Sequence, residues 1–387
     1  MLTAAEAAKR LGVSPATLYA YVSRGLIRSF PDPENPRNRL YAEEDVDRRV
    51  PGKAAERALH WGGPVLDSAI TLIDGNRLYY RGHDVAELAR TRTIEDVASL
   101  IWTGNFAPNA FAMTTLHVIA GRSSDGLPFV NRAASILPIV AARDPLAYDL
   151  RPHAVAQTGW RILNLLTSVA AETSELAATV DETLQKRWAP RAFGARDLIR
   201  AALILCADHE LNVSSFVARC IASAGSNPYA VVAGGLAAIE GNKHGGMTAR
   251  VTTMLDELAR ARDLRAAMAE RMRRGETIYG FGHRLYPNGD PRAELLMEMM
   301  GKHLPKFVSD VAAAGEELLS EKPTIDFALV ALARALKLSS DAPITLFALG
   351  RTIGWVGHAI EQYARDEIIR PRARYTGPHP NSSSASS

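Results

Sequence analysis

Apolar residues recur at intervals of three and four along most of the chain, which is the spacing that places them on one face of an α-helix. The clearest runs of this kind cover residues 84–103, 151–181, 195–208, 228–240 and 248–271. Alternation with a period of two, which indicates strands, is rare by comparison. We therefore expect a mainly α fold with little sheet.

Residues 68–80 are the exception to the helical pattern. Four apolar residues at 69, 70, 72 and 73 precede Asp74-Gly75-Asn76, and three more follow at 78–80. Two short apolar runs on either side of a turn of this composition predict a small β-hairpin.

Breaks in the pattern divide the chain into four parts. Residues 1–49 read as a compact unit of their own, and residues 50–64, with two prolines and three glycines, read as a linker. Residues 65–378 carry the long helical runs. The last residues, 379–387, are rich in serine and low in complexity, so we expect a disordered tail.

The first unit begins with a short helical pattern over residues 4–11, which Gly12 ends. Ser14 then has the character of an N-cap with Pro15 at the first helical position, and a second helix is predicted through Val22. Helix, glycine-containing turn and helix form the helix-turn-helix signature. With the residues at 17–19, 24–27, 39–41 and 45–46, the segment resembles the DNA-binding half of MerR-type and excisionase-type winged helices.

The charge of this unit leaves its purpose open. Residues 1–30 hold four basic residues against one acidic residue, Glu6, but residues 31–50 cancel most of the excess. Phosphate neutralisation normally takes several cations on one face. The sequence is compatible with a DNA-binding arm and equally with a docking or oligomerisation module.

Composition narrows the class of protein. The 387 residues, of which 47% are hydrophobic and 22% charged, can fold as two or three domains with a large core. A net charge of +3 is too balanced to indicate nucleic-acid or membrane binding by the chain as a whole. The two cysteines, Cys206 and Cys220, have neither disulfide-framework nor metal-site spacing. Because the chain shows neither a signal peptide nor an apolar run of about 18 residues, we expect a cytoplasmic protein without membrane contact.

Candidate chemistry gathers in four short segments. Three contain a histidine, and the fourth contains the only acid in a run that leads into an apolar helix; they are residues 207–212 with His209, 241–246 with His244, 280–286 with His283, and 323–329 with Asp326. Glycines flank His244 and precede His283, and they permit positive φ and close approach of a ligand to the backbone. Taken singly, the four residues also fit a polar helix end, an inter-helix turn, a surface loop and a first-turn acid.

Taken together and in this order, the four segments resemble citrate synthases over residues 65–378. The resemblance includes the segments at 67–70, 80–84, 346–355, 361–362 and 369–372, and His358. It implies a two-lobed helical domain, with a large lobe of about 65–245 and 346–378 and a small lobe of about 246–345. It also implies a homodimer or a higher homo-oligomer. The activity implied is condensation of acetyl-CoA with oxaloacetate and water to citrate and CoA, as in the tricarboxylic acid cycle, with no cofactor and no metal.

The family's roles carry over onto the residues that match. Asp326 is expected to remove a proton from the acyl-CoA methyl, His244 to donate as a neutral ring to the enol or enolate oxygen, and His283 to polarise the oxaloacetate ketone. The residues expected to bind substrate carboxylates are His209, Arg292, Arg351 and Arg370, the last of these in the site of the other subunit.

Elementary chemistry agrees with that division of roles. A thioester methyl is a very weak acid, whereas a free Asp has a pKa of about 3.9. A preorganised donor at the developing oxyanion can contribute roughly 3–4 kcal/mol, and a desolvated pocket can raise the pKa of the base. Arginine suits a dicarboxylate because it binds carboxylates with two parallel hydrogen bonds.

One position departs from the family pattern. Many members carry Lys or Arg four residues after the second loop histidine, where it meets a CoA phosphate, but here that residue is Pro287. CoA binding is therefore expected to differ from the family norm, unless Arg284 or Lys243 compensates.

Three alternative activities remain at this point. A 2-methylcitrate synthase would use propionyl-CoA, and one methylene changes discrimination by only about 1–3 kcal/mol. A regulator would use a citrate-synthase-like domain to control a DNA-binding arm. A metal hydrolase is the weakest of the three, because no second histidine follows Asp208-His209-Glu210 at helical spacing.

Overall fold

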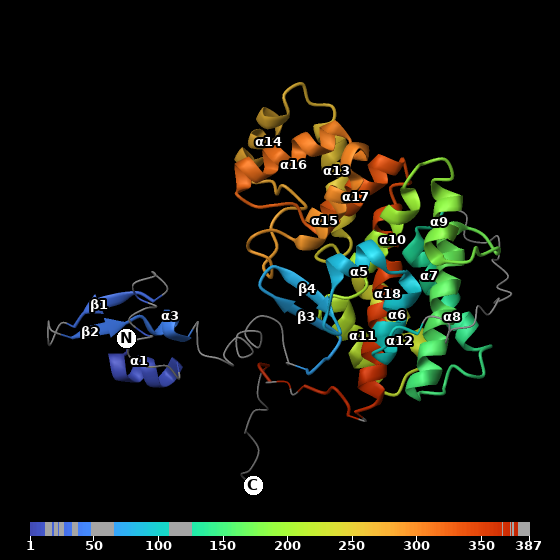
Figure 1. Ribbon diagram of the computed structural model, residues 1–387, viewed down its shortest axis with the longest axis horizontal. Helices are drawn as coiled ribbons and strands as arrows, with labels where there is room; N and C mark the ends of the chain where they lie inside the picture. Colours follow the sequence, from blue (N-terminus) through green and yellow to red (C-terminus); the bar gives the residue numbers. More distant parts are fainter. Residues whose placement is uncertain are drawn as a thin grey trace, which may run out of the picture. The chain divides into compact units, whose positions relative to one another are not determined.

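The computed structural model describes residues 1–11, 18, 22, 27–32, 38–47, 66–107, 126–365, 367–371, 373 and 375–377. The chain divides into two compact units, one of Met1–Asp67 with Pro371–Ser387 and one of Ser68–Arg370 (Figure 1). The predicted linker at 50–64 and the predicted disordered tail at 379–387 lie outside the described residues.

The first unit contains the helices α1 (Ala4–Leu11) and α3 (Glu43–Asp47) and the strands β1 (Ser29–Pro31) and β2 (Arg39–Tyr41). The strands pair antiparallel, and Leu2 pairs with Tyr41. A small core joins these elements through Ala7, Ala8, Leu11, Leu18, Ile27, Tyr41 and Val46. The predicted first helix is confirmed. The predicted second helix, with its cap at Ser14, lies outside the described residues except for Leu18 and Val22.

The second unit opens with the predicted hairpin. Strands β3 (Thr71–Asp74) and β4 (Arg77–Tyr80) pair antiparallel, with Asp74 opposite Arg77 across the turn. Gly75 has φ +60°, a conformation that glycine adopts without strain. A third short strand, β5 (His83–Asp84), pairs with β4 and was not predicted.

Helices make up the rest of the second unit and confirm the predicted fold class. Those on the N-terminal side are α5 (Val85–Thr91), α6 (Ile94–Thr103), α7 (Phe129–Ala141), α8 (Pro152–Ala171), α9 (Val180–Trp188), α10 (Ala195–Leu205), α11 (Val213–Ser223) and α12 (Pro228–Ile239). They are followed by α13 (Met247–Leu258), α14 (Leu264–Arg273), α15 (Pro291–Met300), the 3₁₀ turn η3 (Gly301–His303), α16 (Lys306–Leu319), α17 (Ile325–Leu336) and α18 (Ala342–Tyr363).

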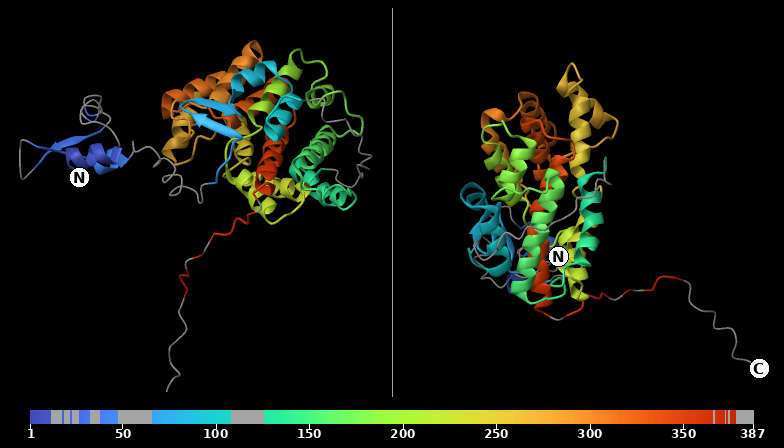
Figure 2. Two further views of the ribbon diagram at one scale, coloured as in Figure 1. Left: turned by 60° about the horizontal axis from the view of Figure 1, so that its bottom comes forward. Right: turned by 90° about the vertical axis from the view of Figure 1, so that its right-hand side faces the viewer.

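Helix α18 is the central element of this unit. It is buried along almost its whole length and contacts α6, α8, α10, α11, α12 and α17, which surround it in Figures 1 and 2. A helix that is apolar on every side is stable only inside such a bundle. The side chains of α18 therefore have fixed surroundings.

Several predicted helical runs are interrupted in the structure. Residues 84–103 form two helices, because Thr93 caps α6 through a reciprocal pair of hydrogen bonds with Asp96. Residues 248–271 divide in the same way at Asp263, which caps α14. The run over 151–181 stops at the left-handed Glu172 and resumes at α9. Apolar periodicity continues across these breaks, so spacing alone did not reveal them.

Helices α13–α17, gold to orange in Figure 1, pack mainly on one another. Helices α15 and α17 also contact α10, and α17 contacts α18. Both helices are thereby packed against α10, and α17 also against the central helix, so the segments at 280–286 and 323–329 belong to the same bundle as His209 and Arg351.

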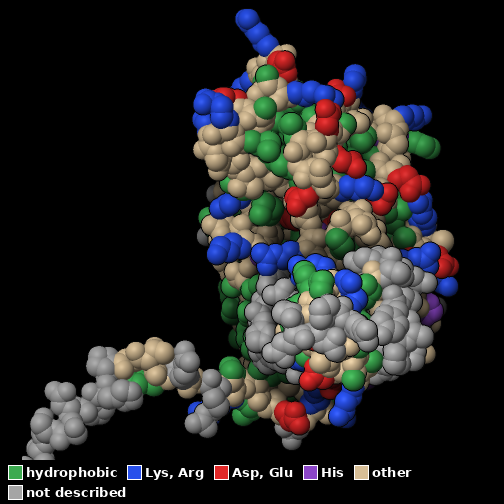
Figure 3. Space-filling model, turned by 90° about the vertical axis from the view of Figure 1, so that its left-hand side faces the viewer, with side chains coloured by type: hydrophobic (Ala, Val, Ile, Leu, Met, Phe, Trp, Pro, Cys, Tyr) green, Lys and Arg blue, Asp and Glu red, His purple; other side chains and the backbone are tan. Residues whose placement is uncertain are grey.

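The surface of this helical group carries both signs of charge. On the face in Figure 3, Lys and Arg side chains are interspersed with Asp and Glu side chains. Ion pairs such as Arg265–Glu317 and Arg334–Asp256 link neighbouring helices there. Within the described part of the chain, none of the helices has both the length and the apolar character needed to cross a bilayer.

Candidate active site

Six of the seven predicted site residues come from separate places in the second unit. They are His209 after α10, His244 between α12 and α13, His283 between α14 and α15, Arg292 in the first turn of α15, Asp326 in the first turn of α17, and Arg351 midway along α18. These groups influence one another electrostatically: Arg292 and Arg351 act on the pKa values of His209 and Asp326, Arg351 acts on the pKa of His244, and Arg292 acts on the pKa of His283.

His209 and His283 face each other. Their ring centroids are 5.2 Å apart and the planes are nearly perpendicular. The Tyr286 hydroxyl lies 3.0 Å from His209 Nε2, and its ring is 5.0 Å from that of His283. Burial, followed by the positive charge of Arg292, lowers the pKa of both histidines, that of His283 to about 4. Both rings are therefore neutral near pH 7.

His244 is held by a chain of hydrogen bonds at the start of α11. Its Nε2 lies 2.9 Å from Ser214 Oγ, which is also 2.9 Å from Asn212 Oδ1. Asn212 is the N-cap of α11 and accepts from the backbone N–H of Ser215. Burial, and then the charge of Arg351, lowers the pKa of His244 to about 4. A neutral ring with one nitrogen fixed by a hydroxyl is suited to donate or accept a single hydrogen bond.

Asp326 is a carboxyl group with one unpartnered oxygen. Its Oδ1 is inaccessible to solvent and makes no hydrogen bond with the described residues. Burial raises the pKa of Asp326 to about 7, while Arg292 opposes the rise and the nearby Asp290 adds to it. A carboxyl group that titrates near neutrality is a candidate general base.

Arg292 is already paired, through Asp290. Arg292 Nε and Nη2 donate to the two Asp290 oxygens at 2.9 and 2.8 Å. Asp290 also caps α15 and accepts from the backbone N–H of Ile325 at 3.0 Å. Burial acts to raise the pKa of Asp290, but the Arg292 guanidinium outweighs it and holds that pKa below its usual value. Asp290 thus links the first turn of α15 to the first turn of α17. Its partner there, Ile325, is the residue immediately before Asp326.

Arg351 has the opposite character. It is completely buried, its Nε donates to the Cys206 carbonyl at 2.8 Å, and both Nη atoms have no hydrogen-bond partner among the described residues. Its guanidinium lies 5.0 Å from the centre of the Phe347 ring, which in turn packs edge-on against His244. A buried guanidinium with two open donors is unstable unless an anion supplies the acceptors. This is the geometry expected of a carboxylate-binding arginine.

The remaining predicted residues lie outside this group. Arg370 is exposed in the segment after α18, and its predicted role in a partner subunit stays a prediction. Pro287, Arg284 and Lys243 are also exposed, and their predicted effect on CoA binding stays a prediction. Within the described ranges, no three His, Cys, Asp or Glu side chains are grouped so as to hold a metal ion.

Sequence reasoning gave no role to four residues of this site. Tyr286 and Asn212 lie within the recognised segments 280–286 and 207–212, and Asp290 and Ser214 lie a few residues beyond them. The signal for Asp290 was present, because Asp-Pro-Arg ahead of a helix is the pattern of an N-cap with proline at the first helical position.

The fold and the site define a helical enzyme domain that places neutral histidines, one carboxyl group of raised pKa and one open arginine around a common point. A family model described as "Citrate synthase, C-terminal domain" matches residues 59–124 and 151–372, and a "Helix-turn-helix domain" model matches residues 1–50. The chain belongs to the citrate synthase family and carries an N-terminal helix-turn-helix domain, which confirms both predicted resemblances.

Individual relatives agree with this assignment. A Mycobacterium tuberculosis protein named "Putative citrate synthase 2" is 32% identical over 80% of this chain and 89% of its own. A Shewanella oneidensis "2-methylcitrate synthase" is 28% identical over 80% of this chain and 91% of its own. The crystal structure of citrate synthase from Thermotoga maritima aligns with a TM-score of 0.67 at 26% identity, over 82% of this chain and 95% of that one.

Proposed function

We propose that the protein condenses an acyl-CoA with oxaloacetate and water, giving citrate and CoA when the acyl group is acetyl. One observation carries the proposal: Asp326 and Arg351, a carboxyl group and a guanidinium in one site, both have terminal atoms that are buried and unpartnered. Structures leave such atoms unsatisfied where a ligand completes them. A substrate carboxylate would complete Arg351, and a proton taken from carbon would complete Asp326.

The first chemical step is enolisation of the thioester. Asp326 takes a proton from the carbon next to the thioester carbonyl, and the electron pair moves onto the carbonyl oxygen. Its raised pKa makes Asp326 a stronger base than a free Asp. His244 stabilises the new oxygen by donating a hydrogen bond, which requires its proton on the nitrogen that faces the substrate. Because Nε2 faces Ser214 Oγ, this proton must be on Nδ1, and the Ser214 hydroxyl must then donate to His244 Nε2 instead of to Asn212 Oδ1.

The second step forms the carbon–carbon bond. The enol carbon attacks the oxaloacetate ketone carbon, and His283 gives its ring proton to the ketone oxygen, which becomes an alcohol. The proton that Asp326 took from carbon then returns to His283, which restores both side chains. Arg351 holds a carboxylate of oxaloacetate, with His209 beside it. Water then cleaves the thioester, releasing CoA as the thiol. The acyl-CoA is a substrate, so this sequence needs no cofactor.

The names of the relatives differ in the product they imply, because one of them is a 2-methylcitrate synthase. The identity of the acyl group therefore needs a test of its own. We propose acetyl-CoA as the substrate and propionyl-CoA as the alternative. The deciding experiment compares kcat/KM for the two, measured as oxaloacetate-dependent release of the CoA thiol by the full-length protein. A preference for propionyl-CoA would reassign the substrate, and no release with either would reject the proposed reaction.

The helix-turn-helix domain supports a second candidate function, which is binding of duplex DNA. Two of the four basic residues in the first 30 are paired within the unit, Arg10 with Glu43 and Arg28 with Asp45. These pairs reduce the charge available to phosphates. Gel-shift titrations of the full chain at low and high salt, with and without oxaloacetate, test this function. Oxaloacetate-dependent binding without turnover would favour a regulator over an enzyme.

A further inference from the structure

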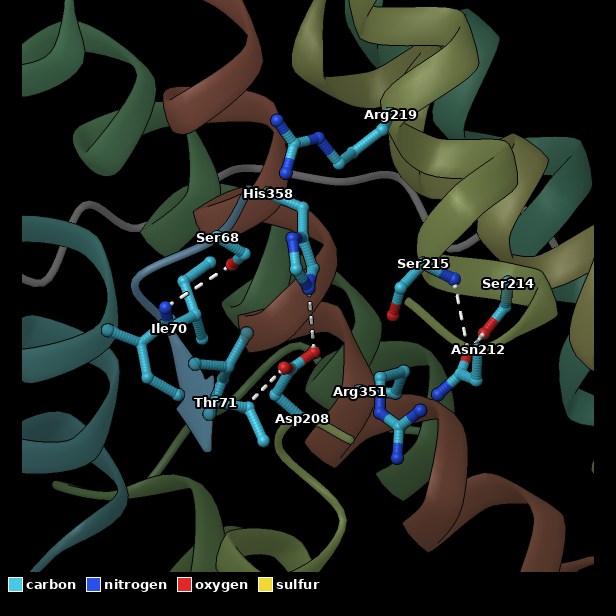
Figure 4. Close-up of polar contacts among 12 residues, drawn as sticks. Ser68, Ile70, Thr71, Asp208, Asn212, Ser214, Ser215, Arg219, Arg351 and His358 are labelled. Carbon is cyan, nitrogen blue, oxygen red and sulfur yellow. Dashed lines mark hydrogen bonds and ion pairs between the residues drawn. The ribbon is translucent and has the colours of Figure 1, made fainter. Parts of the chain in front are cut away.

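A second buried carboxylate, Asp208, lies behind Arg351. It is completely inaccessible to solvent, and each of its oxygens has one partner. The Thr71 hydroxyl donates to Oδ2 at 2.5 Å, and His358 Nε2 lies 3.1 Å from Oδ1. Figure 4 shows Asp208 between these two side chains, which come from β3 and α18. Three segments separated by well over a hundred residues thus meet at one carboxylate.

The backbone of Asp208 is fixed equally well. The Tyr80 hydroxyl lies 3.1 Å from the backbone nitrogen of Asp208 and 3.0 Å from its backbone carbonyl oxygen. Gly354 on α18 makes room for the carboxylate, because a Cβ there would come within 2.5 Å of Asp208 Oδ1. The neighbouring residue in the chain is His209, so a displacement of Asp208 would also move a residue of the site.

Arg351 and His358 are two helical turns apart on α18 and lie on the same face. Burial lowers the pKa of the Arg351 guanidinium, and the negative charge of Asp208 is the foremost influence that opposes this. Asp290 takes the donors of Arg292 in a bidentate pair. Asp208 does not pair with Arg351 in this way, since both Nη atoms of Arg351 are unpartnered.

We propose that Asp208 is a positioning residue for the substrate. Asp208 supplies the counter-charge of Arg351, while Thr71 and His358 form hydrogen bonds with the two Asp208 oxygens. Both Nη groups of Arg351 therefore stay open to a carboxylate of oxaloacetate. The identity of that substrate rests on the proposed function. The hydrogen bonds to Asp208 matter in this arrangement because they prevent a competing ion pair inside the site.

The test replaces the Thr71 hydroxyl. Thr71→Val keeps the shape of the side chain but leaves Asp208 Oδ2 without a donor, and the carboxylate is expected to turn toward Arg351. KM for oxaloacetate should rise roughly tenfold, the scale of one charge-assisted hydrogen bond, while kcat and KM for the acyl-CoA stay within about threefold. Thr71→Ser restores the hydroxyl and should restore KM. A general loss of structure would instead lower kcat and affect both substrates.

A second variant covers the case in which Thr71→Val fails to fold. Asp208→Asn leaves the buried Arg351 guanidinium without its counter-charge until an anion binds, so oxaloacetate should bind roughly 10- to 100-fold more tightly. Calorimetric titration with oxaloacetate reads this directly and does not depend on turnover. If the wild type binds oxaloacetate and the well-folded variants bind it equally tightly, the role of Asp208 is rejected. If the wild type itself does not bind oxaloacetate, the proposed function has failed instead.

Discussion

Two parts of the site differ in how they are built. The α10–α18 wall, made of Asp208, His209, Arg351 and His358, is between 0% and 6% exposed and consists of residues on or beside core helices. The second part is the His244–His283–Asp326 group, whose residues are partly exposed and lie in loops or at the first turn of a helix. Under the proposed function, the wall would hold the charges that bind oxaloacetate, whereas the group at the helix ends would transfer the reacting protons.

Backbone conformation supports this contrast. Gly280 and Gly282, just before His283, have φ of +85° and +74°, in the left-handed region that favours glycine. The α10–α18 wall uses glycine for a different purpose, since Gly350 and Gly354 bring α18 against the carbonyls of Leu203 and Ala207. Left-handed backbone precedes His283, and close approach of α18 to the backbone carbonyls of Leu203 and Ala207 surrounds Arg351.

Asp326→Asn tests the chemical side of the contrast and should have the largest effect. Loss of the base is expected to lower kcat by about 1,000-fold, within the range typical of general acid–base groups. The measurement is steady-state release of the CoA thiol at saturating substrates. A reduction of less than tenfold would mean that another group removes the proton.

Arg351→Leu tests the binding side and should have the next largest effect. Removing the open guanidinium is expected to raise KM for oxaloacetate by about 100-fold, with a smaller change in kcat. Arg351→Lys is the matched control, because it keeps the charge and loses the bidentate geometry, and its KM should fall between the two. An unchanged KM in Arg351→Leu would contradict the assigned role.

The sequence was sufficient to predict the fold class and the helix-turn-helix domain, but several local features were not predictable. The breaks at Thr93 and Asp263 depend on caps whose residues are also common inside turns and loops. The strand β5 has only two residues and forms because β4 is already in place. Short elements of this kind are stabilised by tertiary context rather than by local preference.

For the site, the residues that sequence reasoning singled out were those in glycine-rich or otherwise unusual segments, such as His244 and His283. The supporting residues were missed for a physical reason. Thr71, Asp208 and His358 are far apart in the chain, so their hydrogen bonds leave no local pattern. The sequence likewise does not show that Arg292 is paired and Arg351 is open. This difference depends on which side chains pack around each guanidinium in the folded protein.

The pH dependence of turnover should reflect Asp326. With a pKa of about 7, the carboxyl group is mostly protonated at pH 6 and cannot act as a base. We expect kcat to fall by about tenfold per pH unit below pH 7, while His244 and His283, with pKa values of about 4, stay neutral through that range. A profile flat between pH 5.5 and 8 would show that no group with this pKa controls the step.

The smallest expected effect is on stability. The pKa of Asp326 in the folded protein exceeds the unfolded value of about 3.9, so Asp326 binds its proton more tightly in the folded state. The folded protein therefore loses stability as the pH rises from about 4 to 7. Asp326→Asn removes that penalty. Its Tm should exceed that of the wild type by roughly 2 °C at pH 8 and match it at pH 4. Equal Tm values at both pH values would mean that Asp326 ionises without cost.

The central claim is that binding and chemistry belong to different parts of one site. Calorimetric titration of oxaloacetate into the wild type, Asp326→Asn and Arg351→Leu, side by side, tests it most directly. The claim predicts that Asp326→Asn binds within about threefold of the wild type, whereas Arg351→Leu binds about 100-fold more weakly. Equal losses in the two variants, or an unaffected Arg351→Leu, would contradict it.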